Sequence, residues 1–372
     1  MNEDKATRYN RLKRRADAAS LVWSVVFLGG LVLTGGSIAL RDAAHRLGGG
    51  TAPASPNATS VAVFTMLLIV LSEIGSLPLA FYGGFVLEHR YGLSRQPLRT
   101  WLVDRLKSLA LLVLMGCPAA AALYVLIGRF ALWWWMPAGA VFALLAVGLA
   151  GLAPVLLLPL FYRVQPVTRQ PLRARLLALA QRAGAPVLDV YEWGLGEKTR
   201  KANAALAGFG ATRRILVSDT MLAEYSDDEI EVVMAHELGH HVHGDIWTGL
   251  AFEAGLILVG FLVASWALRA AVVPVGLAGV GDVAGLPVLL LAAGAVSLLA
   301  VPAAHALSRA HERRADRFAL TLTGNGSAFA SAMRRLAAQN MAEAEPSPIV
   351  RWLFHSHPSM RERIEAARPF GA

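Results

Sequence analysis

The sequence is poor in cysteine and in charge. Its 372 residues include one cysteine, Cys117, and only 16% of them are charged. One cysteine excludes an intrachain disulfide and a metal cluster built on thiolates. So small a charged fraction, beside 55% hydrophobic residues, is atypical of a soluble enzyme of this length. The composition therefore indicates a membrane protein.

Long apolar runs support this interpretation. A helix needs about 20 residues to cross a hydrocarbon core of about 30 Å. Six stretches reach that length: residues 21–40, 61–87, 109–127, 131–162, 246–273 and 286–307. The fourth is longer than one crossing requires, so it is either tilted, kinked or partly re-entrant. We expect a mainly α-helical protein with about six membrane spans.

Basic residues are distributed unevenly among the connecting segments. They gather before the first span and in the loops after the second and fourth, whereas the other loops have few. The positive-inside rule assigns the basic segments to the cytoplasm, together with the N-terminus. This rule also explains the net charge of +9 without a nucleic-acid partner, and no nucleic-acid-binding fold is recognisable.

Residues 236–240 read His-Glu-Leu-Gly-His, the HExxH pattern of zinc hydrolases. Residues four apart share a helix face, so His236 and His240 can bind one metal ion, with Glu237 beside it as a candidate base. Ser226 and Glu229 have the spacing of a capping box, which predicts where this helix begins.

A catalytic zinc site needs a third protein ligand and leaves one position for water. We expect Glu312 to be that ligand, since the last two spans would form a hairpin that returns it to the HExxH helix. Asp316 lies four residues further on, on the same helix face, and can orient a ligand histidine. The alternatives are an exposed Glu312 paired with Arg309 or Arg313, and an ordinary salt bridge for Asp316.

The sequence divides into four segments by these criteria. Residues 163–245 are predicted to form a small cytoplasmic α+β catalytic segment, with a helix over 171–183. Strands over 187–193 and 214–217 would form a short hairpin or an edge strand beside the HExxH helix. The other segments are residues 1–162 with four spans, the membrane hairpin 246–307, and the cytoplasmic C-terminal segment 308–372.

Several stretches resemble the type I CAAX prenyl endopeptidases, a family of membrane zinc metallopeptidases. The resemblance extends from about Pro78 to Ile364. It rests on HELGH, on Ser308-Arg309 with Glu312 and Ala315-Asp316, on His357-Pro358-Ser359, on Phe85–Ser94, on Pro159-Leu160-Phe161, and on Lys201-Ala202-Asn203-Ala204. The chain differs from the family in two ways. Eukaryotic members have seven membrane spans around a chamber, whereas six are expected here. Their substrate-strand motif usually contains an aromatic residue, whereas this chain reads Asn203-Ala204-Ala205.

The resemblance implies an activity and several residue roles. It implies a zinc-dependent endopeptidase with one Zn²⁺ per chain, acting on C-terminal CAAX-type, lipidated or amphipathic peptides at the membrane. His357 would stabilise the oxyanion, the alternative being a structural histidine before Pro358. Asn203 would position the substrate, the alternative being a turn residue. The arginine- and alanine-rich composition favours a bacterial cytoplasmic membrane.

Two other functions stay open from the sequence. One is a quality-control protease for membrane proteins. The other, of a different class, is a zinc-bound membrane scaffold or transporter that hydrolyses nothing.

Overall fold

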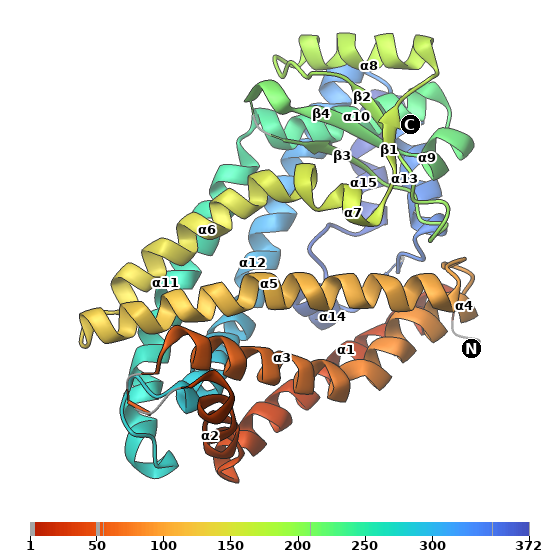
Figure 1. Cartoon of the computed structure of the whole chain (residues 1–372). Helices are drawn as coiled ribbons and strands as arrows, with labels where there is room; N and C mark the ends of the chain where they lie inside the picture. Colours follow the sequence, from red (N-terminus) through yellow and green to blue (C-terminus); the bar gives the residue numbers. More distant parts are fainter. Residues whose placement is uncertain (1–3, 50–52, 55, 209, 344, 372) are drawn as a thin grey trace.

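The computed structural model describes residues 4–49, 53–54, 56–208, 210–343 and 345–371. Long helices form one part of the molecule, and a smaller part combines a sheet with shorter helices (Figure 1). Six helical segments in the described residues are long and apolar enough to cross a membrane: Lys5–Leu33, Ala58–Arg90, Leu98–Phe130, Trp135–Leu152, Asp245–Val275 and Val283–Thr323. The prediction of a mainly helical protein with six spans is thereby confirmed.

The membrane part contains these helices and the short elements between them. They are α1 (Lys5–Leu33), α2 (Gly36–Gly48), α3 (Ala58–Phe81), a π-helical turn (Tyr82–Val86), α4 (Leu87–Arg90), α5 (Leu98–Phe130), α6 (Trp135–Leu156), α7 (Leu158–Phe161), α11 (Asp245–Val275) and α12 (Leu286–Thr323). Large apolar side chains remain exposed along them, including Leu144, Leu299 and Val273. Such side chains would contact lipid.

Two predicted span limits need correction. The first span ends at Leu33 rather than at Leu40, because Gly35 adopts a left-handed conformation with a φ of 75° and a separate helix, α2, follows. The long fourth stretch is one span, α6, followed by the four-residue helix α7. It is therefore neither re-entrant nor two crossings.

Within the described residues, the smaller part contains the strands and the remaining α-helices. They are β1 (Val164–Pro166), α8 (Gln170–Arg182), β2 (Val190–Trp193), β3 (Ala204–Ala207), β4 (Arg214–Ser218), α9 (Asp219–Glu224), α10 (Asp227–Val242), α13 (Gly326–Gln339), α14 (Pro348–Phe354) and α15 (Met360–Ala367). Leucines of α8 at positions 172, 176 and 179 are fully buried against the sheet and α10. Each such side chain contributes about 1.5–3 kcal/mol of burial.

The sheet has the order β1-β2-β4-β3. The prediction that residues 187–193 and 214–217 form a hairpin is wrong, because β2 and β4 pair in parallel and the hairpin joins β3 to β4. Parallel neighbours need a long connection, and residues 194–213 supply it. The composition of alanine-rich β3 did not indicate a strand, since alanine has low β propensity, and only the family resemblance implied a substrate strand at Asn203-Ala204-Ala205. It is one of the two edge strands, β1 being the other, and it lies beside α10.

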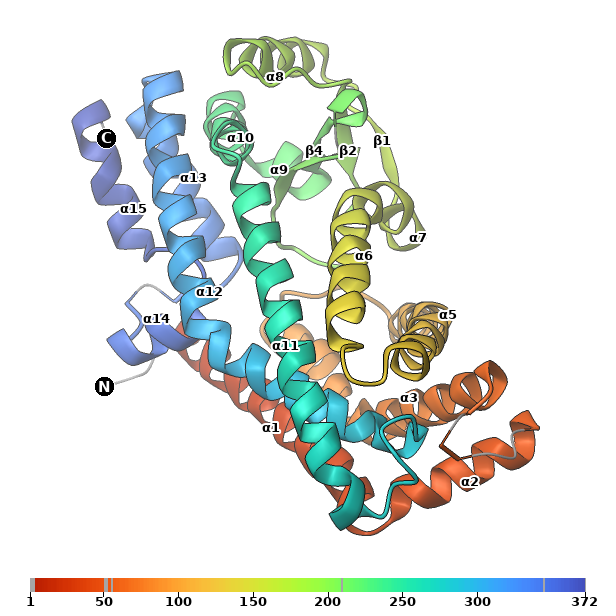
Figure 2. The same cartoon turned by 90° about the vertical axis from the view of Figure 1, so that its left-hand side faces the viewer.

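Helix α12 joins the two parts. Its 38 residues span about 57 Å, nearly twice a hydrocarbon core, so one helix can cross the membrane and still reach the catalytic part. Figure 2 shows α12 running beside α11 and on past α10 and α13. The predicted hairpin of the last two spans is thus present.

The N-terminal end of α1 contacts the catalytic part. Asn10 Nδ2 donates a hydrogen bond of 2.7 Å to the Met341 carbonyl, and Arg14 forms an ion pair of 2.7 Å with Glu343. The start of α1 and the smaller part therefore lie at the same end of the membrane helices, as Figure 1 also shows.

Candidate metal centre and active site

The HExxH helix α10 begins with the predicted capping box. The Ser226 side chain accepts a hydrogen bond from the Glu229 backbone N–H, and the Glu229 carboxylate accepts one from the Ser226 N–H. Ser331 and Arg335 of α13 also bind Glu229, at 2.6 and 2.9 Å. The cap therefore fixes both the start of α10 and its contact with α13.

Gly239, between the two histidines, allows α12 to approach α10 closely. A Cβ atom there would lie 3.1 Å from the Ala315 Cα and 3.1 Å from a ring carbon of Phe318. Such distances are shorter than ordinary packing contacts, so an alanine would push the two helices apart. The close approach brings Glu312 of α12 to the histidines of α10.

His236, His240 and Glu312 come together as predicted. One ligand atom from each lies within 4.8 Å of the others, and the histidine Nε2 atoms face each other at 3.2 Å. Glu312 Oε1 lies 3.5 Å from His240 Nε2. The buried Glu312 Oε2 has no hydrogen-bond partner among the described residues. Two imidazoles and one carboxylate form the donor set of zinc hydrolases such as thermolysin, and a metal cation would satisfy this oxygen.

Asp316 lies where the sequence placed it. Its Oδ1 atom accepts a hydrogen bond of 2.8 Å from His236 Nδ1. Buried Arg363 of α15 holds the same carboxylate with two bonds, of 2.9 and 2.6 Å. Because Nδ1 carries the proton, Nε2 of the neutral imidazole presents its lone pair to the shared point. Arg363 was not predicted to have this role.

Asp245 does the same for His240 and was missed by sequence reasoning. Its Oδ2 atom accepts a hydrogen bond of 2.8 Å from His240 Nδ1, and Arg314 of α12 binds its other oxygen. Asp245 lies just after α10 ends, at the first position of α11. Gly244, with a φ of 66°, makes the turn that sends Asp245 back towards His240. Helical spacing alone cannot place such a residue.

The electrostatic environment favours a cation at this point. Burial alone lowers the pKa of His236, but the nearby carboxylates of Asp316, at 2.8 Å, and Glu312, at 3.4 Å, outweigh it and raise the pKa to about 9. The pKa of His240 is also raised, because its bonds to Glu312 and Asp245 outweigh its burial. The carboxylates thus stabilise positive charge on both rings. The residues present fit a divalent metal.

The alternative roles for Glu312 do not match the contacts. Arg309 donates to the His355 carbonyl at 2.6 Å, and Arg313 pairs with Glu362 at 2.6 Å. Glu312 is 6% exposed, so it is not a surface carboxylate. It faces the two histidines instead.

Glu237 and His357 both lie beside the metal-ligating group. Glu237 is partly buried, and this burial raises the pKa of its carboxyl, while His236 and His240 oppose the shift. His357 Nε2 lies 3.2 Å from Glu312 Oε1, and Ser356 contacts its Nδ1 at 2.9 Å. The His357 side chain is 57% exposed, so it can also reach a bound molecule.

The group opens into a cavity of about 540 Å³. Asn203 and Ala204, at the start of edge strand β3, line this cavity together with Glu237, Glu312 and His357. Of the predicted site residues, His236, Glu237, Glu312, Asn203 and His357 line this cavity, whereas His240 and buried Asp316 lie behind its wall. Residues of α1, among them Lys13 and Arg14, form another wall.

Asn340, at the end of α13, holds the chain just before Asn203. Its side chain accepts a bond of 3.2 Å from the Ala202 N–H and donates one of 3.3 Å to the Ala202 carbonyl. Asn203 itself bonds to β4: its N–H donates to Ser218 Oγ at 3.0 Å, and its carbonyl accepts from the Ser218 N–H at 2.9 Å. Asn340 was not singled out by sequence, since 137 residues separate it from Asn203.

In this chain, membrane helices place an HExxH motif and a distant glutamate beside one cavity. This arrangement defines a class of proteins, the membrane-embedded metallopeptidases. Family models place the chain within it. Residues 166–370 match the model described as "Peptidase family M48", and residues 2–163 match "CAAX prenyl protease N-terminal, five membrane helices". The chain belongs to peptidase family M48. In residues 2–163 the described part of this chain has four candidate spans and the shorter helix α2.

Individual relatives agree with this assignment. The chain is 32% identical over 308 residues to "Uncharacterized metalloprotease YhfN" of Bacillus subtilis, a match covering 82% of this chain and 72% of that protein. It is 24% identical over 315 residues to "Probable CAAX prenyl protease 1" of Schizosaccharomyces pombe, covering 84% and 66%. The crystal structure of S. mikatae Ste24p has the same fold, with a TM-score of 0.85 at 24% identity, covering 98% of this chain and 87% of that one.

Proposed function

We propose that this chain is a zinc-dependent endopeptidase that cleaves C-terminal CAAX-type, lipidated or amphipathic peptides at the cytoplasmic face of a bacterial membrane. The observation that carries the proposal is the convergence of His236, His240 and Glu312 beside Glu237, in a cavity bordered by an edge strand.

His236, His240 and Glu312 would hold one zinc ion per chain. When bound, zinc polarises the scissile carbonyl and lowers the pKa of a coordinated water. Glu237 accepts the proton of the attacking water and delivers it to the leaving amine. His357 donates a hydrogen bond to the oxyanion. Asp316 and Asp245 hold the two histidines in the orientation and tautomer that metal binding requires.

A substrate peptide would add to the outer edge of β3. An extended peptide on an edge strand gains main-chain hydrogen bonds, and the Asn203 amide can pair with its backbone. The CAAX-type substrate class rests on the name of the Schizosaccharomyces pombe relative, together with a cavity beside membrane helices that would admit a membrane-bound peptide.

The proposed orientation of the protein in the membrane rests on the distribution of its basic residues. The start of α1, the loop after α4 and the catalytic part lie at one end of the spans, and these are the segments rich in arginine and lysine. The positive-inside rule assigns that end to the cytoplasm. Within this proposal, residues 1–162 and 246–307 form the membrane part, and residues 163–245 and 308–372 the catalytic part.

The test compares three peptides on the purified full-length protein: a farnesylated CAAX peptide, the same peptide unmodified, and an unfolded amphipathic peptide. We expect hydrolysis of the farnesylated peptide, about one zinc per chain, and loss of activity with a chelator. Efficient cleavage of the unfolded peptide alone would favour the quality-control function instead.

The Glu237→Gln variant tests the mechanism. Its hydrolysis rate should fall about 10²- to 10⁴-fold, because the general base is lost, while its zinc content stays at the wild-type value. His236→Ala and Glu312→Ala should instead lose zinc. Undiminished hydrolysis by Glu237→Gln, or full zinc content in both ligand variants, would contradict the mechanism. Zinc binding with no hydrolysis of any peptide would favour the scaffold or transporter.

A further inference from the structure

A second cavity, of about 430 Å³, lies where α5 meets α7 and the loop that follows β2. It is separate from the cavity of the metal-ligating group and shares no lining residue with it. Four basic residues line it, against two carboxylates. They are Arg99, Lys107, Arg163 and Lys198, with Asp104 and Glu197.

The two carboxylates do not neutralise the four cations. Asp104 lies between two lysines, 2.5 Å from Lys198 and 3.9 Å from Lys107, so its single charge is shared. Glu197 pairs loosely with Arg163 at 3.5 Å. Arg99 is exposed and has no hydrogen bond or ion pair within the described ranges. Four positive and two negative charges leave the cavity with a charge of +2.

The wall opposite α5 is aromatic and rigidly placed. Lys198 Nζ lies 4.7 Å from the centroid of the Tyr162 ring, and Lys107 Nζ donates a bond of 2.9 Å to the Leu160 carbonyl. The backbone N–H of Arg95 also donates to the Lys198 carbonyl at 3.1 Å. These contacts hold Lys107 and Lys198 against the wall of the cavity, whereas exposed Arg99 stays available to a ligand.

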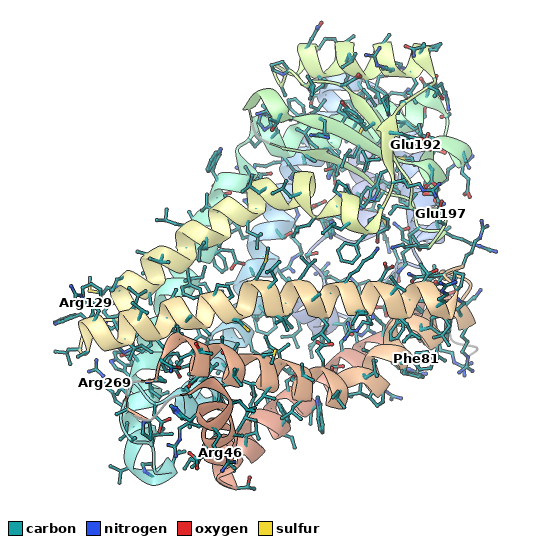
Figure 3. The ribbon with its side chains drawn as sticks, viewed as in Figure 1. Arg46, Phe81, Arg129, Glu192, Glu197 and Arg269 are labelled. Carbon is teal, nitrogen blue, oxygen red and sulfur yellow. The ribbon has the colours of Figure 1, made fainter. Side chains whose placement is uncertain are left out.

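The cavity lies where the helices meet the membrane surface. The uncharged run of α5 begins at Ser108, so its first ten residues extend about 15 Å beyond the hydrocarbon core. Helices α5 and α6 are consecutive spans that diverge from a short turn, so the start of α5 and α7 lie at the same membrane face (Figure 1). Figure 3 shows Glu197 between the sheet and the first turns of α5.

Apolar side chains beside the cavity point away from the protein. Leu106 and Leu160, beside the cavity, are 65% and 48% exposed, and Leu112 and Leu114, in the uncharged run of α5 that enters the hydrocarbon core, are 46% and 68% exposed. A cationic, aromatic-walled cavity at the interface, flanked by exposed leucines, matches the two ends of a lipid. A free phosphate ion would use the cations but not the leucines.

We propose that this cavity binds the headgroup of an anionic phospholipid, with the phosphate between Arg99 and Lys107 and the acyl chains along the exposed leucines. Basic pockets between membrane helices recognise such headgroups through charge and hydrogen bonding. The proposal concerns a site apart from the metal-ligating group and does not depend on the peptidase mechanism.

The test uses the full-length protein, purified in detergent and titrated with phosphatidylglycerol or phosphatidylcholine, with bound lipid counted by native mass spectrometry. Wild-type protein should bind one phosphatidylglycerol more tightly than phosphatidylcholine. The double variant Arg99→Gln/Lys107→Gln should bind it about 10- to 30-fold more weakly, since each cation near an anionic headgroup contributes about one decade or less.

Two further variants control the result. Arg105→Gln removes a cation from the same helix that pairs with Glu73 at 2.8 Å and does not line the cavity, so it should bind as wild type. Glu197→Gln removes an opposing charge at an exposed position and should tighten binding. Equal affinity for the two lipids, equal loss in Arg105→Gln, or displacement of the lipid by millimolar inorganic phosphate would overturn the proposal.

Discussion

Each histidine of the metal-ligating group directs Nε2 to the shared point and Nδ1 to a carboxylate. For His236 the carboxylate is Asp316, and for His240 it is Asp245, both at 2.8 Å. A carboxylate can only accept, so it selects the tautomer whose Nε2 lone pair is free for a metal. Two aspartates from different helices thus perform the same task.

This equivalence predicts the effect of removing Asp245. Asp245→Ala should weaken zinc binding about 10- to 100-fold, because the His240 ring loses its orientation and some basicity. Competition with a zinc-binding dye measures the change. The control is Asp228→Ala, which removes an exposed carboxylate of α10 that pairs with Arg175. Unchanged zinc affinity in Asp245→Ala would show that the 2.8 Å contact has no such role.

Among the secondary-structure elements, β3 is the strand that borders the cavity of the metal-ligating group. It is an alanine-rich edge strand, paired on one side with β4, and it borders the cavity through Ala204. Short side chains suit a strand whose backbone is approached closely by another chain. The contacts of Asn340 with Ala202 hold the beginning of this strand.

The Asn340→Ala variant tests this arrangement. We expect KM to rise several-fold with zinc content unchanged, because the start of β3 loses two hydrogen bonds while the metal ligands are not touched. Gln339→Ala is the control, since Gln339 bonds Tyr225 and Glu224 on the other side of α13. A fall in kcat alone, or equal effects of the two variants, would argue against a role in substrate positioning.

Helix α8 is fixed to β2 by a pH-dependent contact. Arg173 binds Asp189 with two bonds, of 2.6 and 2.9 Å, and these lower the pKa of the Asp189 carboxyl. In the unfolded chain this pKa is about 3.9. The pair therefore stabilises the fold fully above about pH 4, and its contribution is lost as the pH falls through the lower folded pKa.

Asp189→Asn should accordingly lower the midpoint of thermal unfolding at pH 7 by an amount equivalent to at most about 1 kcal/mol. Near pH 3 the difference from wild type should shrink. Glu192→Gln, in β2, is the control. The Glu192 carboxylate accepts a hydrogen bond from the neutral Gln165 side chain, so its removal should cause no comparable pH-dependent change in stability. A difference that grew on acidification would have the wrong sign.

In the whole molecule, the two ends of the membrane helices differ in chemistry. One end bears the catalytic part and the cationic cavity. At the other, buried Arg41 of α2 pairs with Asp282 at 2.6 Å and Tyr124 donates to the Asp282 carbonyl at 3.3 Å, which joins α2, α5 and the loop before α12. Figure 3 shows Arg46 at this end and Glu197 at the other.

The proposed orientation predicts which end is reached from outside a cell. In a Cys117→Ala background, Arg46→Cys should react with a membrane-impermeant thiol reagent on intact cells. Glu197→Cys should react only after permeabilisation. Both residues are exposed, and the single natural cysteine makes the background simple. The reverse labelling pattern would place the catalytic part outside and refute the orientation.

Local patterns determined much of this protein. Bilayer thickness sets the length of an apolar run, so hydropathy alone found six spans and erred only at their ends, as at Gly35. The i,i+4 geometry of one helix placed His236 beside His240, and the capping box marked where that helix begins. These features depend on interactions between residues that are close in the sequence, so the sequence pattern predicts them directly.

Tertiary structure decided how distant segments meet. The contact of Glu312 with the two histidines needs the close approach of α10 and α12 at Gly239, and Asp245 needs the turn at Gly244. The parallel pairing of β2 with β4, the Asn340 contacts and the cationic cavity likewise join segments far apart in the chain. Such contacts depend on how distant helices and strands pack together in the folded chain. The residue periodicity within a single segment carries no information about that packing.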